Sequence, residues 1–128
     1  MFIQNLSGEQ KAVFLYLAHE VALADGNISG KEQQMMSTFC AQIPGVEPKK
    51  CSLCDLAEVF ESKRARVSAF LELAAIAQAE SGVNEEERKF LDSLASAFGL
   101  SNYEVNDMLS WVVRQFNLFN EAQAFMED

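Results

Sequence analysis

Apolar residues recur at the three- and four-residue spacing of an amphipathic α-helix along nearly the whole chain, and the strict alternation of a β-strand is absent. The clearest apolar stripe follows Ser101. It consists of Val105, Met108, Leu109, Val112, Val113 and Phe116. Because only two prolines interrupt the helical pattern, it predicts an all-α fold, a single-domain bundle of six to seven helices.

Capping-box patterns mark where four of these helices begin. A serine or asparagine is followed three residues later by glutamate or glutamine, so that each side chain can bond the other residue's backbone amide. The pairs are Ser7 with Gln10, Ser29 with Glu32, Asn84 with Glu87, and Ser101 with Glu104. The predicted helices cover residues 8–23, 30–43, 48–60, 64–79, 85–98 and 102–116, with a short final helix near 120–126.

The stretch "ADGNISGKE" between the first two predicted helices matches the second half of an EF-hand calcium loop. Asp25, Gly26 and Glu32 fall at the acid, glycine and final glutamate positions of that loop. The first and third positions, which supply side-chain oxygens, fall on Val21 and Leu23 within a continuous apolar helix. The sequence therefore excludes an EF-hand and indicates a helix, a short turn with acids, and a second helix.

A similar helix–turn–helix unit recurs in the second half of the chain, where residues 79–91 overlie residues 24–36. The acids of the two turns pair as Asp25 with Glu80 and Glu32 with Glu87. If the two units pack about a pseudo-twofold axis, their turns come near one another. The expected divisions are two repeat units, about 8–45 and 64–100, and C-terminal helices over 101–127.

The acids of these turns have a structural and a metal-binding interpretation. Glu32 and Glu87 are sufficiently explained as capping-box residues at helix N-termini. Asp25 and Glu80 stand at helix C-termini, where the macrodipole disfavours negative charge and a bound cation would reverse the penalty. Asp25 can alternatively cap its own turn. Carboxylates favour calcium, magnesium or manganese over zinc, so the predicted metal ligands are Asp25, Glu32, Glu80 and Glu87.

The segments "LAHEVALADGNISGKE" and "LELAAIAQAESGVNEEERKFLDSLASAFGLS" resemble the tellurite-resistance TerB family. That family shows an alanine-rich helix running into Ala-Asp-Gly with a glutamate seven residues after the Asp, repeated more loosely in the second half. The resemblance covers most of the chain from Leu15 to Ser101; it departs at Glu80, where aspartate is expected, and at Ser81 and Gly82, which displace the glycine. It implies a compact helical fold, a divalent-cation site made of the repeated acids, a role in stress or tellurite resistance beside membrane and calcium-binding partners, and no catalysis.

The three cysteines fit a reduced compartment better than a disulfide framework. The pair in "CSLC", Cys51 and Cys54, has too few partners for a four-ligand zinc site and lacks the βαβ context of a redox motif. Cys40 falls on the apolar stripe of the second predicted helix and Cys54 flanks that of the third. We therefore expect the cysteines to act as small core residues.

Net charge narrows the classes of partner. At −9 and a pI near 4.5, the surface repels nucleic acid, anionic membranes and oxyanions, and it favours cations and basic protein faces. No apolar run approaches the ~20 residues of a membrane span, and the N-terminus lacks a basic start, so we expect a cytoplasmic protein without direct membrane insertion.

Two functional hypotheses follow. The first is a TerB-like stress-response protein that binds a divalent cation (calcium, magnesium or manganese) and works with other proteins, in a membrane-associated tellurite-resistance complex. The alternative is a metal-free acidic adaptor, co-chaperone-like or a partner of a membrane complex, that docks a basic protein. No nucleophile–base constellation or cofactor loop is present, so the sequence predicts neither an enzyme nor an organic cofactor.

Overall fold

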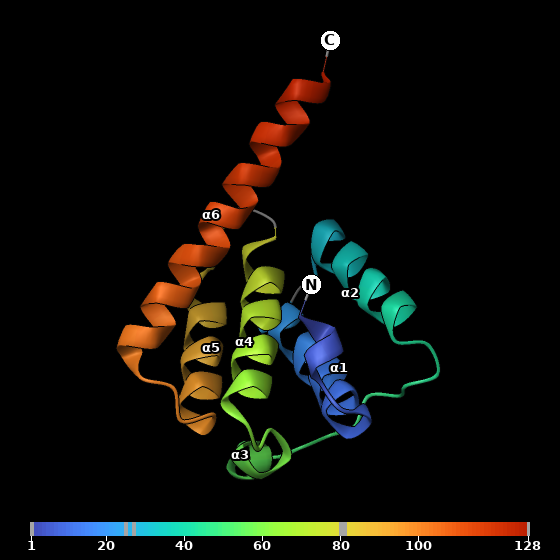
Figure 1. The fold of residues 1–128 in the computed structure, drawn as a ribbon, viewed down its shortest axis with the longest axis vertical. Helices are drawn as coiled ribbons and strands as arrows, with labels where there is room; N and C mark the ends of the chain where they lie inside the picture. The colour runs from blue at the N-terminus through green and yellow to red at the C-terminus, as the bar shows by residue number, and fades with distance from the viewer. Residues whose placement is uncertain (1, 25, 27, 80–81, 128) are drawn as a thin grey trace.

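Helices and the turns between them make up the computed structural model of this chain, which describes residues 2–24, 26, 28–79 and 82–127 (Figure 1). The all-α prediction is confirmed, since no strand occurs in that part of the chain. The α-helices are α1 (Gly8–Ala22), α2 (Gly30–Gln42), α3 (Leu56–Val59), α4 (Lys63–Gln78), α5 (Glu85–Ala97) and α6 (Asn102–Met126). Two 3₁₀ turns, η1 (Ile3–Asn5) and η2 (Leu53–Asp55), complete the fold.

Helix α4 is the centre of the bundle. It packs against α1, α2, α5, α6 and η1, and in Figure 1 it runs between α1 and α5. Small side chains on its buried faces let these neighbours approach closely, because interaxial distance depends on the side chains at the contact. They are Ala65, Ser68, Ala69, Ala74 and Ala77. Its large buried residues, among them Phe70 and Leu73, fill the space between the surrounding helices.

Two edge-to-face pairs of phenylalanine join elements that are distant in sequence. Phe14 of α1 meets Phe39 of α2 with ring centroids 5.2 Å apart, and Phe60 meets Phe98 at the same separation. Such pairs add about 0.5–1.5 kcal/mol to the burial of the rings. They fix α2 on α1, and the end of α3 on the end of α5.

The side chain of Arg66 on α4 caps two other helices. Its guanidinium donates hydrogen bonds to the carbonyls of Ala57 (2.8 Å) and Phe60 at the end of α3, and to the carbonyl of Phe98 (3.3 Å) at the end of α5. The last carbonyls of a helix have no partner within it, and a positive charge beside them is favourable. A single arginine therefore ties α3 and α5 to α4.

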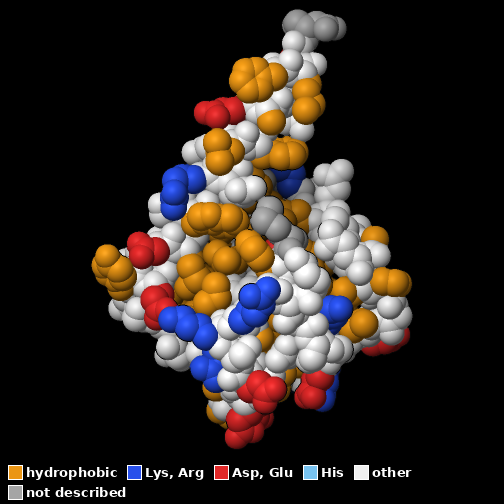
Figure 2. Space-filling view, viewed as in Figure 1, with side chains coloured by type: hydrophobic (Ala, Val, Ile, Leu, Met, Phe, Trp, Pro, Cys, Tyr) orange, Lys and Arg blue, Asp and Glu red, His pale blue; other side chains and the backbone are white. Residues whose placement is uncertain are grey.

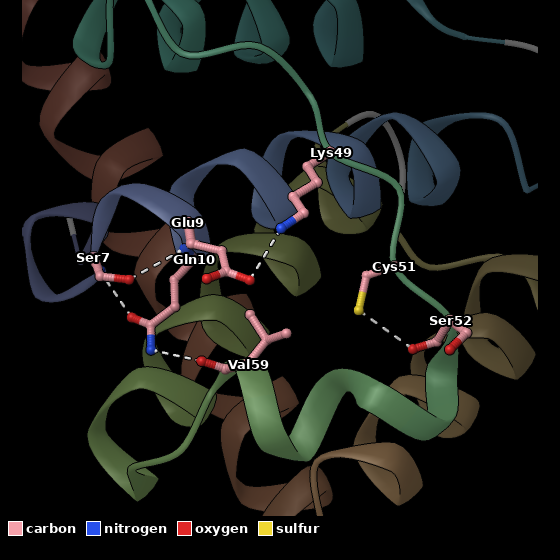
Figure 3. Close-up of polar contacts among 7 residues, drawn as sticks. All are labelled: Ser7, Glu9, Gln10, Lys49, Cys51, Ser52 and Val59. Carbon is pink, nitrogen blue, oxygen red and sulfur yellow. Dashed lines mark hydrogen bonds and ion pairs between the residues drawn. The ribbon is translucent and has the colours of Figure 1, made fainter.

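The helix predicted over residues 48–60 is wrong for its first half. Only Leu56–Val59 is α-helical, and the chain from 46 to 52 is irregular. The amide of Lys49 donates to the carbonyl of Ala12, 2.9 Å away, and its ammonium group pairs with Glu9 at 3.1 Å (Figure 3), so this segment is bound along α1 instead of coiling on itself. As a result Leu53 is exposed.

The last helix of the chain is longer than predicted. Helix α6 runs unbroken to Met126, because no glycine or proline occurs between residues 102 and 126 to end it. The separate short helix near 120–126 is therefore wrong. Val113, expected on the buried stripe, is exposed, while Val105 and Val112 are buried. The second half of α6 extends beyond the other helices (Figure 1).

Among the described residues, no helix combines the length and the apolar character that crossing a bilayer requires.

The Arg66 cap can be tested by replacing it with methionine, which keeps the apolar stem and removes the donors. We expect Arg66→Met to lower the free energy of unfolding by about 1–3 kcal/mol, because half-buried carbonyls lose their partners. Arg64→Met is the matched control, since exposed Arg64 donates one hydrogen bond, to Asn5 Oδ1, and should cost about 0.5 kcal/mol or less. Urea denaturation followed by circular dichroism measures both. Equal losses would contradict the capping role.

Candidate functional site

The two turns that carry the predicted metal ligands lie at the same end of the bundle, the upper end in Figure 1. One turn joins α1 to α2 and the other joins α4 to α5. Lys31 in the first turn of α2 lines the same surface hollow as Ala79 and Gly82 of the second turn. The expectation that the turns come near one another agrees with this placement.

This hollow, of about 540 Å³, is about half polar and is called the turn hollow below. Its third wall is the middle of α6, from Phe116 to Asn120. The polar side chains that line it come from three helices. They are Lys31, Gln34, Thr38, Gln78, Asn117 and Asn120. Amide and hydroxyl oxygens are ligands that hard cations accept, and they can equally bind polar groups of a protein.

Glycine permits both turns their backbone conformation. Gly26 has φ +91° and Gly82 has φ +107°, values in the region that favours glycine. In the sequence overlay Gly26 falls on Ser81, and the second glycine stands one residue later. The displaced glycine therefore retains a left-handed backbone position at the second turn.

Glu32 is a buried residue, 4% exposed, that completes the predicted capping box of α2. Ser29 Oγ accepts from the Glu32 amide at 3.1 Å, and Glu32 Oε1 accepts from the Ser29 amide at 2.9 Å. The second carboxylate oxygen, Oε2, has no hydrogen-bond donor among the described residues. The capping box therefore uses one of the two carboxylate oxygens of Glu32.

Glu87 has the corresponding position at the start of α5 and is 3% exposed. Asn84 Oδ1 accepts from the Glu87 amide at 2.8 Å, and Glu87 Oε1 accepts from the Asn84 amide at 3.2 Å. The structural interpretation of both glutamates is therefore confirmed. The same motif is formed at Ser7 and Ser101, so all four predicted capping boxes are present.

Asp25 and Glu80, the other two predicted ligands, lie outside the described residues. In the part of the chain that is described, no three His, Cys, Asp or Glu side chains gather closely enough to hold a metal ion. A cation bound with Glu32 or Glu87 would therefore also need ligands from the two turns. The metal site remains a prediction.

An apolar groove adjoins the turn hollow, and sequence reasoning did not identify it. It has a volume of about 340 Å³ and lies between α2, α4 and α6. In Figure 2 hydrophobic side chains gather over the region of α4 and α6. The apolar lining consists of Phe2, Met35, Leu71, Ala75, Trp111, Val112, Phe116 and Phe119. The available signal was the apolar stripe of the last helix, which continues beyond Phe116 to residues 119 and 126.

The prediction that the cysteines are core residues is wrong for Cys40 and Cys54, which are exposed, and Cys51 is only partly buried. Cys40 follows Phe39, the residue that α2 buries, and so is rotated by about 100° away from the core. Cys54 lies in η2, where α-helical spacing does not apply. The Cys51 thiol donates to the Ser52 carbonyl at 3.4 Å (Figure 3). Burial, and then the negative charge of Asp55, raise the pKa of this thiol.

Thiol reactivity tests this arrangement. We expect Cys51 to react more slowly than Cys40 or Cys54 with a soluble disulfide reagent at mildly alkaline pH, because its raised pKa leaves less thiolate and its side chain is less accessible. Three variants that each keep one cysteine, with the others changed to serine, give the separate rates. The outcome that contradicts the arrangement is a Cys51 rate equal to that of Cys40.

Comparison with known proteins adds no relative: no family model, no curated protein and no solved structure matches this chain.

Proposed function

We propose that this chain is a non-enzymatic TerB-like module that binds a divalent cation beside the turn hollow, through Asp25, Glu32, Glu80 and Glu87. The observation that carries the proposal is that the start of α2, directly after the first turn, and the second turn line one hollow that is about half polar. Each turn is followed by a helix whose first turn holds a buried capping glutamate. Two acid-bearing turns in that position provide the kind of oxygen-rich site that calcium, magnesium or manganese prefers.

The capping boxes are compatible with this function. Capping uses Oε1 of Glu32 and not Oε2, so a cation bound at Oε2 would leave the box intact. Lys31, which lines the hollow, opposes a cation by charge repulsion. A site with a capping glutamate and a competing ammonium group would bind weakly, and its occupancy would follow cation concentration.

Packing of the two units supports the TerB-like repeat. Helix α1 packs against α4, and each of them leads through a glycine-containing turn into a capped helix. This is the relation that a pseudo-twofold axis between the units would produce. In a cytoplasmic stress response such as tellurite resistance, the cation would adjust how the module contacts proteins of a membrane-associated complex.

A metal-free adaptor is the second candidate. At the end of the bundle opposite the turns, Asp55, Glu58 and Glu61 are exposed around α3, and Figure 2 shows acidic side chains gathered at that lower end. With a net charge of −9, this surface suits a basic partner protein.

Calorimetric titration of calcium, magnesium and manganese into chelator-treated protein tests the proposal. We expect the titration to give one weak site per chain. Denaturation with and without cation should show a rise in unfolding free energy of about 1.4 kcal/mol when free cation is tenfold above its dissociation constant. Silence for all three cations at millimolar concentration would contradict cation binding and leave the adaptor.

The ligand role of Glu32 is separable from its capping role. Glutamine serves in the capping box of α1, where Gln10 pairs with Ser7, so Glu32→Gln should keep the stability measured in chelator. It should lose most of the cation-induced rise in melting temperature, because a neutral amide binds a cation less well than a carboxylate. The matched control is Glu104→Gln, which alters the capping box of α6, a helix that follows neither of the two turns.

For each variant, the melting temperature in cation is compared with the melting temperature of the same variant in chelator. This removes the effect of a second contact of Glu104, which pairs with Lys63 at 2.7 Å, a contact that lowers the pKa of Glu104 to about 2. A cation response equal in the Glu32 and Glu104 variants would rule out Glu32 as a ligand.

Asp25 gives a complementary test. Neutralising an acid at a helix C-terminus removes an unfavourable interaction with the helix dipole. Asp25→Asn should therefore stabilise the metal-free protein by roughly a few tenths of a kcal/mol. The same variant should respond to added cation less than the parent. Melting curves that match the parent's in both conditions would show that Asp25 only caps its turn.

A further inference from the structure

Helix α6 carries one apolar stripe along its whole length, but only the first half of the stripe is covered. In the first half, Val105 and Val112 are buried against the bundle. Beyond Phe116 the stripe continues at the same seven-residue spacing, with Phe119 and Met126 following Val112. Leu118 and Phe125 follow Trp111 at this spacing along the flank of the stripe. A stripe of this kind is typical of a helix that packs against another helix.

The second half of the stripe is exposed on a helix that extends beyond the other helices (Figure 1). Phe119 is 61% exposed, Phe125 89% and Met126 76%. The stripe also leads directly from the apolar groove, because Trp111, Phe116 and Phe119 line that groove. The apolar groove and the exposed second half of the α6 stripe therefore form one continuous apolar surface.

We propose that this surface is a homodimer interface, in which the α6 helices of two copies pair antiparallel and each projecting half covers the groove of the other copy. Pairing centred between Leu118 and Phe119 sets the partner's Phe125 and Met126 over Trp111 and Val112. A twofold axis at that point makes the contact self-complementary, as closed dimers require. The same pairing covers the exposed stripe of both copies at once.

The area agrees with a stable dimer. Leu118, Phe119, Phe125 and Met126 together expose about 500 Å² of mostly apolar surface, taking ~150–250 Å² for each large side chain. These side chains contribute about 1,000 Å² from two copies and the two covered grooves add to it, so the interface exceeds the roughly 1,000 Å² that a specific interface requires.

Charge favours a second copy at this surface. Although the chain carries a net charge of −9, Glu121 is the only charged residue from 115 to 126. At 100° per residue it falls opposite Phe119 and about 40° from Phe125, so it lies at the edge of the interface. The interface therefore brings together the least charged part of two acidic molecules, and the acids elsewhere stay in solvent.

Analytical ultracentrifugation over a concentration series tests the proposal. We expect the full chain to reach twice its 14.3 kDa mass at micromolar concentration. Phe119→Glu should raise the dimer dissociation constant by at least about tenfold, since it places a charge at the centre of the interface. Tyr103→Glu is the matched control: Tyr103 is 79% exposed on the same helix but lies away from the stripe, and the variant should dimerise like the parent.

Trp111 provides a second measurement, because it is the only tryptophan in the chain and lines the groove. Its emission should shift to longer wavelength when the protein is diluted through the dissociation constant, and Phe119→Glu should show the shifted emission at every concentration. Circular dichroism checks that the variants keep the parent's helix content.

A parent chain that stays monomeric at high micromolar concentration would overturn the proposal, as would equal dissociation constants for the Phe119 and Tyr103 variants. If the monomeric parent instead shows a Trp111 shift on adding a basic amphipathic helical peptide, a foreign helix occupies the groove and the homodimer is equally refuted. Neither result depends on the cation site.

Discussion

Helix α4 packs against α1, α2, α5, α6 and η1, and this central packing determines where the other elements lie. Its alanines allow α1, α5 and α6 to approach closely, and its large residues fill the gaps between them. Arg66 then supplies the hydrogen bonds that the ends of α3 and α5 cannot make within themselves. Because α1 and α4 pack directly together, the turns that follow them lie at one end of the bundle. The turn hollow is a consequence of that packing.

Local signals in the sequence were sufficient for much of this fold. A capping box involves residues three apart, so the starts of α1, α2, α5 and α6 followed from residue type and spacing alone. Errors arose where a distant contact decided the outcome. The amide of Lys49 bonds to Ala12 of α1, which periodicity within 46–60 does not reveal. For the same reason periodicity predicts an α-helix around Cys54, where the chain forms the 3₁₀ turn η2.

The candidate site was also predictable only where it depends on local sequence. The capping roles of Glu32 and Glu87 followed from the sequence motif, whereas their burial did not. The polar and apolar hollows did not, since each is lined by residues from α2, α4 and α6, and its shape depends on how those helices pack. These two hollows share Met35, Phe116 and Phe119, so a cation beside one and a helix in the other would act on the same side chains.

We propose that the two turns form one cation site. Amide NMR spectra recorded during addition of manganese test this proposal, because a bound paramagnetic ion broadens the resonances of nearby amides. We expect substoichiometric manganese to broaden amides of residues 24–32 and 79–87 together, while Glu58 and Glu61 at the opposite end keep their intensity. Broadening spread evenly over all exposed acids, or confined to one of the two turns, would contradict it.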